Sequence, residues 1–295
     1  MQLNAGSFFE SGWQHRRQEI VAWIDSVSPD IVCLQEIWRR SEHESTAAWI
    51  ADAVVGQWYE AFGGHPLPER HSTGSRPAAP IEFGSAVLSR WPIEHHSSHP
   101  LPSGRSGESA SAFPYEVVHV STAGLDVFST HLSAAPTDGD RRLVQVVALD
   151  NVVREVRGSR DRFDSHGERR VGMPPILCGD FNSEPESDEI RFLRGLTVLD
   201  ERTTFWQDAW LVAGPAGDPG HTQDWRTHDL AADLNIHRKR IDYVFVGDAF
   251  RREGNAGRVR SARLVCDEAL TGVQASDHMG LLVDIEWPER PMAES

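Results

Sequence analysis

The residues best suited to chemistry lie in residues 175–185, where acidic and amide side chains follow a short apolar run. Residues 175–178 are typical of a buried strand, and Gly179 then permits a tight turn of the backbone. Asp180 and Asn182 are one residue apart, so in an extended chain both side chains point to the same side. Open α/β sheets bind ligands at the carboxyl ends of strands, and this carboxylate–amide pair therefore marks a candidate ligand site.

Further acids, amides and histidines lie at the ends of other predicted strands and could join this pair. They are Asn4, Glu36, His131, Asp242, Asp277 and His278. Each of them alone has an ordinary structural explanation. A single histidine such as His131 is more often a hydrogen-bonded structural residue than a catalyst, and residues 277–278 could form a turn before the last strand. The set as a whole carries more weight than any one member.

Helices and strands alternate along the chain in an order that would bring these residues together. Apolar residues at helical spacing predict helices over residues 14–27, 42–55 and 138–156, with a shorter one from residue 187. Apolar or alternating runs predict strands at residues 31–34, 83–92, 115–120, 125–130, 240–247, 259–266 and 279–287. The opening order of strand, helix and strand implies a crossover, which places Asn4 and Glu36 at like ends of two strands.

Four segments lack the periodicity of a helix or a strand and are rich in Gly, Pro, Ser, His or Asp. They are residues 63–80, 96–114, 157–174 and 214–239. The series of strands continues across them without a change of composition. We therefore interpret them as long loops of a single domain spanning residues 1-295, and loops of this length in a compact domain commonly carry function.

The chain is acidic. Its 295 residues include 44 Asp and Glu against 29 Lys and Arg, which gives a formal net charge of −15. This balance provides no general attraction to the phosphates of DNA or RNA, although a local basic groove or a divalent cation could reverse the sign near a site. Nucleic acid is therefore a possible partner that the net charge does not favour.

The three cysteines, Cys33, Cys178 and Cys266, are far apart in apolar segments and form no CxxC pair. They resemble small buried hydrophobic residues, and reduced thiols suit the cytoplasm. The sequence is also compatible with one disulfide bridge between two of them. The N-terminus lacks a basic segment followed by an apolar one, and no apolar run approaches the roughly 20 residues that span a membrane. We expect a cytoplasmic protein without a membrane partner, unless the natural start lies upstream of Met1.

Seven short segments, running from the first predicted strand to the last, form a pattern. They are Leu3–Asn4, Cys33–Glu36, Val87–Arg90, Ser129–Leu132, Cys178–Asn182, Arg240–Tyr243 and Ala275–His278. In this order they resemble the endonuclease/exonuclease/phosphatase superfamily, which has the deoxyribonuclease I-like fold. Gly-Asp-Phe-Asn and Ser-Asp-His, with Gln-Glu upstream, are specific signals of that family. The first strand departs from the pattern, because only three residues precede Asn4 where members usually have several apolar ones.

The resemblance implies an α/β fold, namely a four-layer α/β sandwich of two packed mixed β-sheets flanked by helices, with the site at one end of the sheets. It also implies Mg²⁺-assisted attack of water on phosphorus, with Mn²⁺ as a possible substitute. Such a reaction needs oxygen ligands for a hard cation, a water in line with the leaving group, and donors to the non-bridging phosphate oxygens.

The resemblance also assigns expected roles to the residues around the water and the phosphate. Asp180 would hold and deprotonate the attacking water, and Asn182 would fix its orientation. His131 and His278 would donate hydrogen bonds to the phosphate. Asp242 would orient His278, as carboxylates commonly do for functional imidazoles.

The expected metal ligands lie elsewhere in the pattern. Glu36 would be the main ligand, Asn4 would help to place the metal or the phosphate, and Asp277 would assist on the metal or leaving-group side. Two residues are candidates for substrate binding. Arg240 precedes the Ile-Asp-Tyr segment and could face the site, while Trp225 could stack on a base or a sugar or could equally pack in the core.

The sequence thus predicts a divalent-metal-dependent phosphoesterase that hydrolyses a phosphodiester or a phosphomonoester, with a substrate that is small or nucleotide-like. The alternative within the same class is a Mg²⁺-dependent endonuclease or exonuclease acting on DNA or RNA. A non-catalytic binding module on the same fold is a further alternative. Such a module would be expected to have lost Glu36, His131, Asp180 or His278, and the sequence retains all four.

Overall fold

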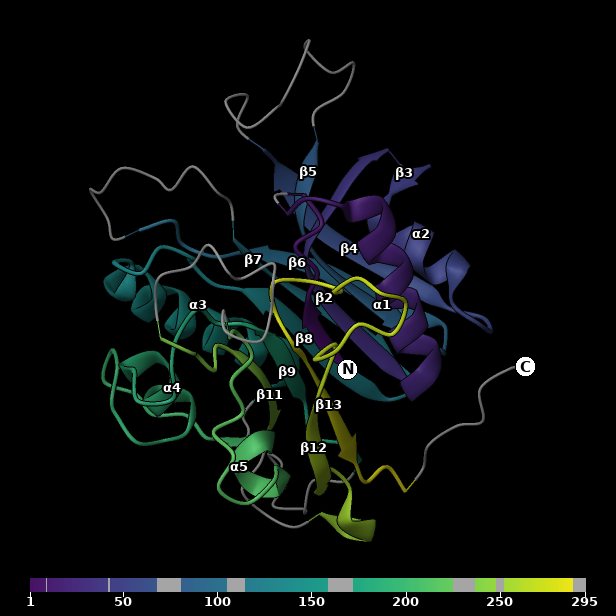
Figure 1. Cartoon of the computed structure of the whole chain (residues 1–295). Helices are drawn as coiled ribbons and strands as arrows, with labels where there is room; N and C mark the ends of the chain where they lie inside the picture. The colour runs from purple at the N-terminus through teal and green to yellow at the C-terminus, as the bar shows by residue number, and fades with distance from the viewer. Residues whose placement is uncertain are drawn as a thin grey trace.

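Two β-sheets pack face to face and helices cover the outer side of each sheet, as the computed structural model of the chain shows (Figure 1). The structure describes residues 1–8, 10–41, 43–67, 81–104, 115–158, 172–224, 237–247 and 252–288. The arrangement confirms the expected four-layer α/β sandwich of two mixed sheets flanked by helices.

The first sheet has seven strands in the order β12-β13-β1-β2-β5-β4, with β3 paired to β2. They are β1 (Gln2–Asn4), β2 (Ile31–Ser41), β3 (Glu44–Ser45), β4 (Tyr59–Pro66), β5 (Glu82–Ser89), β12 (Val259–Val265) and β13 (Gly280–Ile285). Strands β1 and β2 are parallel, with Asn4 beside Gln35. This pairing confirms the predicted crossover, which brings Asn4 close to Glu36.

The second sheet has six strands in the order β10-β11-β9-β8-β7-β6. They are β6 (Ile93–Pro100), β7 (Glu116–Thr122), β8 (Leu125–His131), β9 (Ile176–Asp180), β10 (Trp206–Asp208) and β11 (Asp242–Gly247). The pair β8–β9 is parallel, and its neighbours on both sides are antiparallel. The predicted hairpin is therefore present as β7 and β8.

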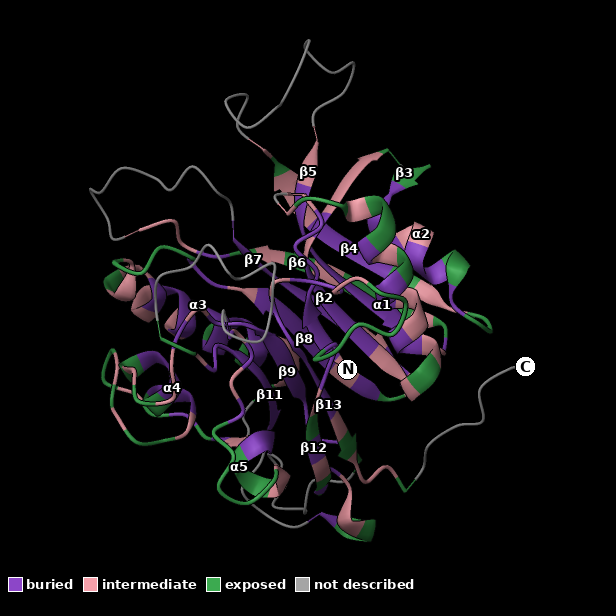
Figure 2. Ribbon diagram, in the orientation of Figure 1, coloured by how far each residue is buried: buried purple, intermediate pink, exposed green. Residues whose placement is uncertain are grey.

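Three apolar cores lie between the four layers. Helices α1 (Trp13–Val27) and α2 (Thr46–Ala53) pack on the first sheet, and α3 (Gly139–Arg157) and α4 (Asp188–Leu193) pack on the second. The third core fills the space between the sheets and includes Trp210 from the short helix α5 (Ala209–Ala213). Figure 2 shows that buried residues concentrate on the strands and on the helix faces that meet them.

The helices follow the apolar periodicity of the sequence. Helix α1 buries Ile20, Trp23 and Ile24 and ends at Ser28, which has a left-handed φ of 44° and precedes a proline. Helix α2 begins later than predicted because the Ser45 side chain caps it by accepting from the backbone N–H of residue 48. Among the described residues, no helix is long and apolar enough to cross a lipid bilayer.

Strands β4 and β6 extend into segments that we expected to be loops, and this expectation is wrong. Each of them lies at the end of its sheet and pairs with a strand on one side only. Much of β6 is exposed, so its sequence, with three histidines and two serines, lacks the apolar alternation of a buried strand. Pairing with β7 forms this strand, and local sequence does not reveal such a partner.

Candidate active site

Three candidate residues lie side by side across the second sheet. Asp180, at the end of β9, is paired in register with His131 at the end of β8 and with Asp242 at the start of β11. Residues paired directly across a sheet point to the same face. The sheet therefore places two carboxylates and one imidazole in a single row, although the three residues are far apart in the sequence.

Gly179 is required for a reason different from the one we expected. It lies inside β9, and a Cβ atom built on it would lie 2.1 Å from the carbonyl oxygen of Thr130 on β8. Only glycine allows the two strands to pair this closely, so the predicted tight turn at Gly179 is wrong. The backbone bends further along, at Asn182, which has a left-handed φ of 48°.

The Asp180 carboxylate is buried, with 1% of the residue exposed, and it is held from two sides. Its Oδ1 accepts a 2.8 Å hydrogen bond from the backbone N–H of Asn182, and its Oδ2 accepts a 3.0 Å bond from Nδ2 of Asn4. Burial and the charge of Asp242 raise the pKa of Asp180, against the opposing effect of two histidines. A carboxylate with a raised pKa is a better proton acceptor than an ordinary aspartate.

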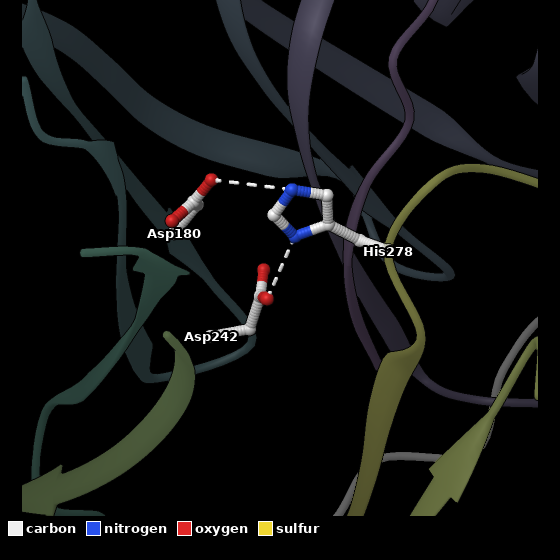
Figure 3. A group of neighbouring side chains, drawn as sticks. All are labelled: Asp180, Asp242 and His278. Atoms are coloured by element: carbon white, nitrogen blue, oxygen red, sulfur yellow. Dashed lines mark hydrogen bonds and ion pairs between the residues drawn. The ribbon is translucent and has the colours of Figure 1, made fainter. Parts of the chain in front are cut away.

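His278, in the loop before β13, lies between Asp180 and Asp242 (Figure 3). Its Nδ1 is 2.8 Å from Oδ2 of Asp242, and its Nε2 is 3.9 Å from Oδ2 of Asp180. The other oxygen of Asp242 accepts a 2.9 Å bond from Nε2 of Gln2. Because both carboxylate oxygens accept, Nδ1 of His278 donates to Asp242, and Nε2 is left on the side of Asp180.

The charge state of His278 follows from its surroundings. Burial is the largest single effect and lowers the pKa of this imidazole, but the carboxylates of Asp242, Asp277 and Asp180 outweigh it. The pKa of His278 therefore lies well above its ordinary value, which favours the protonated imidazole. Its Nε2–H can donate a charge-assisted hydrogen bond to an anion.

His131 lies on the other side of the Asp180 carboxylate. Its Nε2 is 3.6 Å from Oδ2 of Asp180 and 3.1 Å from Nδ2 of Asn182. The Asn182 amide also donates a 3.1 Å bond to the carbonyl oxygen of Leu132, so it ties the end of β8 to the chain that follows β9. With 12% of its side chain exposed, His131 borders solvent from which a substrate could approach.

A β-bulge in β2 brings Glu36 to the site. The pairing of β2 with β5 shifts by one residue between Leu34 and Ile37, and Glu36 within this bulge has a left-handed φ of 55°. Its Oε1 accepts a 3.0 Å hydrogen bond from Nδ2 of Asn4, the same nitrogen that contacts Asp180. The Asn4 amide thus connects the two sheets at their carboxylates.

Three acidic side chains gather next to this bulge: Glu36, Asp277 and Glu10. Burial raises the pKa of Glu36, and Asp277 adds to this effect while His131 opposes it. Burial raises the pKa of Glu10, and the charges of Asp277 and Glu36 raise it further. Sequence analysis missed Glu10, because it belongs to no motif; its one signal is an acid in the loop shortly after Asn4.

A second residue that sequence analysis missed, Arg16 of α1, holds this loop in place. Its guanidinium is 2% exposed and donates hydrogen bonds of 2.7–3.0 Å to five backbone carbonyl oxygens. These belong to Ala5, Gly6, Glu10, Ser11 and Ala275. Arg16 therefore fixes the loop that follows Asn4 against the loop that carries Asp277 and His278.

Two groups of residues could hold a divalent cation. Side-chain atoms of Asp180, Asp242 and His278 lie within 4.8 Å of one another, but the His278–Asp242 hydrogen bond already uses Nδ1 and one carboxylate oxygen. The acids Glu36 and Asp277 offer oxygen donors and repel one another, so a cation between them would offset their charges. The second group therefore fits a hard divalent cation better.

The structure bears on only one of the two predicted substrate-binding residues. Arg240 is 2% exposed; its Nη1 lies 2.8 and 3.0 Å from the two carboxylate oxygens of Asp208, and its guanidinium lies over the ring of Tyr243. This buried ion pair leaves the guanidinium no exposed face for a substrate, so the expectation for Arg240 is corrected to a structural role. Trp225 lies outside the described residues, and its role stays a prediction.

Known proteins resemble the chain in sequence. The profile of the Endonuclease/Exonuclease/phosphatase family matches residues 1–278. Sphingomyelin phosphodiesterase 5 of Danio rerio is 27% identical over 241 residues, which cover 74% of this chain and 41% of that protein. The 2',5'-phosphodiesterase 12 of Rattus norvegicus is 24% identical over 306 residues, covering 92% of this chain and 46% of that protein. The chain spans less than half the length of these relatives.

A solved structure with a similar fold is an endonuclease/exonuclease/phosphatase family protein from Leptotrichia buccalis. It superimposes with a TM-score of 0.63 at 16% sequence identity, over 97% of this chain and 98% of that one. At this level of identity the comparison concerns the fold. It agrees with the two-sheet sandwich described above.

Proposed function

Because the chain belongs to the endonuclease/exonuclease/phosphatase family, we propose that it is a divalent-metal-dependent phosphoesterase, which hydrolyses a phosphodiester or a phosphomonoester by in-line attack of water. The observation that carries the proposal is the surroundings of Asp180. A buried carboxylate with a raised pKa lies between the Nε2 atoms of two imidazoles, at 3.6 and 3.9 Å, beside a separate pair of acids.

Asp180 accepts the proton of the attacking water in this proposal. Its two hydrogen bonds, from Asn182 and Asn4, fix the direction of the carboxylate, and its raised pKa suits a general base. Asn182 lies between Asp180 and His131 and orients the water with its amide. Holding a water in one position removes much of the entropic cost of the attack.

His131 and His278 bind the phosphate oxygens. The protonated His278 supplies positive charge where negative charge develops during the attack, and Asp242 keeps its ring in one orientation and tautomer. Gln2 holds Asp242 in turn. The N-terminal strand of the first sheet thus supports a histidine from the far end of the chain.

Glu36 and Asp277 would hold Mg²⁺, with Asn4 beside them and Glu10 close enough to contribute charge. A hard divalent cation supplies Lewis-acid polarisation of a phosphate oxygen when bound. The fit rests on the oxygen donors and on the burial and mutual repulsion that raise the pKa values of Glu10 and Glu36. Mn²⁺ has similar ligand preferences and could replace Mg²⁺.

A small or nucleotide-like phosphate ester fits the site better than a long polyanion. Two arginines that flank the site motifs, Arg142 and Arg240, are each 8% exposed or less and form ion pairs with Glu189 and Asp208. They are therefore not available to follow a nucleic-acid backbone, and the net charge of −15 acts in the same direction. Two relatives named phosphodiesterases support an ester with two substituents.

A substrate screen tests the proposal. The purified protein is incubated with Mg²⁺ or Mn²⁺, with and without chelator, and offered a chromogenic bis-ester, a mono-ester, plasmid DNA, RNA and sphingomyelin. We expect metal-dependent release from the bis-ester or mono-ester that the chelator abolishes. Cleavage of DNA or RNA faster than the small esters would support the nuclease alternative. Absence of metal-dependent turnover of every substrate would contradict both the phosphoesterase proposal and the nuclease alternative.

Two wider proposals accompany this function. We propose that residues 1-295 form one domain, and two observations support this: the first and last strands of the first sheet pair with each other, and one core joins both sheets. A cytoplasmic location is supported by three buried cysteines that are free thiols in this structure. Fractionation of cells that express the tagged protein would test the location.

A further inference from the structure

A pair of cysteines, one from each sheet, meets in the core between the sheets. Cys33 lies in β2 and Cys178 in β9, and they are 1% and 5% exposed. Both belong to the same core cluster, and each thiol shifts the pKa of the other: the Cys178 thiol raises the pKa of Cys33, and the Cys33 thiol lowers that of Cys178. Cα atoms of β2 and β9 come within 8 Å of one another. The two strands that carry the sulfurs therefore pack against each other across the space between the sheets.

Both cysteines line a cavity of about 400 Å³. Its lining includes the apolar residues Leu125, Val127 and Ile176 and also the acids Asp30 and Asp284. A cavity of this volume has room for several molecules the size of water, which occupies about 30 Å³ each in the liquid. The cavity therefore has room for a small uncharged oxidant next to two thiols that are almost fully buried.

We propose that Cys33 and Cys178 form a redox-active dithiol, which a peroxide converts into a disulfide bridge between the two sheets. In the first step one sulfur attacks a peroxide oxygen, the O–O bond breaks, and a sulfenic acid and one water form. In the second step the other sulfur attacks the sulfenic sulfur, the S–S bond forms, and a second water leaves. The two thiols lose two electrons and two protons, and hydrogen peroxide is reduced to two waters.

The third cysteine provides an internal control. Cys266 is fully buried, but it lies in the core between α1 and the first sheet and does not line the cavity. Burial alone therefore does not distinguish the three thiols. The cavity and the neighbouring sulfur distinguish Cys33 and Cys178 from Cys266.

The bridge would join the two strands that carry the principal acids of the site. Glu36 follows Cys33 in β2, and Asp180 follows Cys178 in β9. A change of turnover on oxidation would rest on the proposed function. Formation of the bridge does not rest on it, so the two claims fail separately.

Peptide mapping tests the bridge in the native protein. The reduced protein is treated with hydrogen peroxide under native conditions, free thiols are blocked with N-ethylmaleimide, and the chain is unfolded and digested without reductant. We expect a linked peptide that contains Cys33 and Cys178 and no free thiol at either position. Cys266 should keep its free thiol, which becomes accessible only when the chain is unfolded. Reductant added before digestion should restore both thiols.

Two variants sharpen the result. C33S removes one partner, so no linked peptide forms and Cys178 proceeds to the sulfinic acid. C266S should give the same Cys33–Cys178 peptide as the parent. Persistence of free Cys33 and Cys178 after peroxide treatment would overturn the proposal, and so would linkage of Cys266 to the same extent, since that pattern indicates reaction of unfolded chains. If C33S does not fold, peptide mapping of the parent protein, with Cys266 as its internal control, still decides the proposal.

Discussion

At the scale of single residues, the carboxylates of the site differ in their proposed roles because each one makes different contacts. The two carboxylate oxygens of Asp242 accept hydrogen bonds from Gln2 and His278, and the charge of Asp242 raises the pKa of the imidazole. Asp180 is held by amides and has a raised pKa, which suits proton transfer. Glu36 lies close to Asp277, which suits a cation. Residues of one chemical type therefore receive different functions from their neighbours.

The D242N substitution should narrow the pH range of activity. Because the folded pKa of His278 is raised, the stabilising charge is fully present below its ordinary pKa of about 6.5 and is lost as the pH rises through the folded value. D242N removes the largest favourable charge, so the alkaline limb of kcat/KM should move to lower pH. An NMR titration of the imidazole in chelator should show its pKa moving in the same direction.

A matched control for this prediction is D284N, an exposed aspartate on β13. It should leave both the pH profile and the imidazole titration unchanged. An unchanged alkaline limb in D242N, with normal thermal stability, would show that His278 does not set that limb.

At the scale of elements, the site depends on three local departures from regular structure. The bulge in β2 re-aims Glu36, the glycine in β9 permits close pairing with β8, and the loop after β1 wraps around Arg16. Regular strands would point Glu36 elsewhere and would separate His131 from Asp180. Each departure can be tested by a single substitution.

Replacing Gly179 with alanine should destabilise the fold. The new Cβ would lie 2.1 Å from the Thr130 carbonyl oxygen, so β8 and β9 must separate at the position of His131 and Asp180. We expect a loss of at least about 2 kcal/mol in the free energy of unfolding, measured by urea denaturation. G139A in the first turn of α3, where the nearest atom is 3.9 Å away, should cost little. Equal stability of the two variants would contradict the close approach.

Replacing Arg16 with lysine should loosen the loop that follows Asn4. A lysine ammonium has three N–H donors where the guanidinium uses five, so at least two buried carbonyl oxygens lose their partner. The expected loss is roughly 1–3 kcal/mol of stability for each, together with a fall in kcat/KM.

The matched control is R17K, the same change at the next position of α1. The Arg17 guanidinium stacks over the ring of Trp49 on α2. Thermal melts and kcat/KM should therefore change little in R17K. If R16K and R17K behaved alike in both measurements, Arg16 would not position the loop.

At the scale of the whole molecule, each sheet supplies part of the site. The first sheet carries Asn4 and Glu36, the second carries His131, Asp180 and Asp242, and the loop before β13 adds residues 277–278. The core between the sheets therefore sets the distance between the acids and the imidazoles. A cation that binds at the edge between the sheets should stabilise the whole fold.

Addition of Mg²⁺ or Mn²⁺ should raise the melting temperature. A ligand that binds only the folded state at a hundred times its Kd contributes about 2.7 kcal/mol. E36Q should remove most of this metal-dependent rise, whereas the E44Q control, an exposed glutamate on β3, should keep it. A full rise in E36Q would place the cation elsewhere, with Asp180, Asp242 and His278 as the next group to test.

Much of the fold and of the site could be predicted from the sequence because their signals are local. Apolar periodicity located α1 and α3, and short motifs located Asp180, Asn182 and His278. Contacts that join distant segments could not be predicted this way. The partner of Arg240 is Asp208, 32 positions away, and edge strand β6 is formed by its neighbour. Arg16 binds backbone carbonyl oxygens of a loop and Glu10 contributes charge from that loop, and neither role leaves a pattern in the sequence.

The measurement that tests the account most directly is metal-dependent turnover of the D180N variant. With the best substrate of the screen and saturating Mg²⁺, we predict a fall in kcat of about 100-fold or more, since an amide cannot accept the proton of the attacking water. D188N, an exposed aspartate on α4, should retain the parent rate. D180N turning over at the parent rate, with its fold and metal stabilisation intact, would contradict the assignment of Asp180 as the general base.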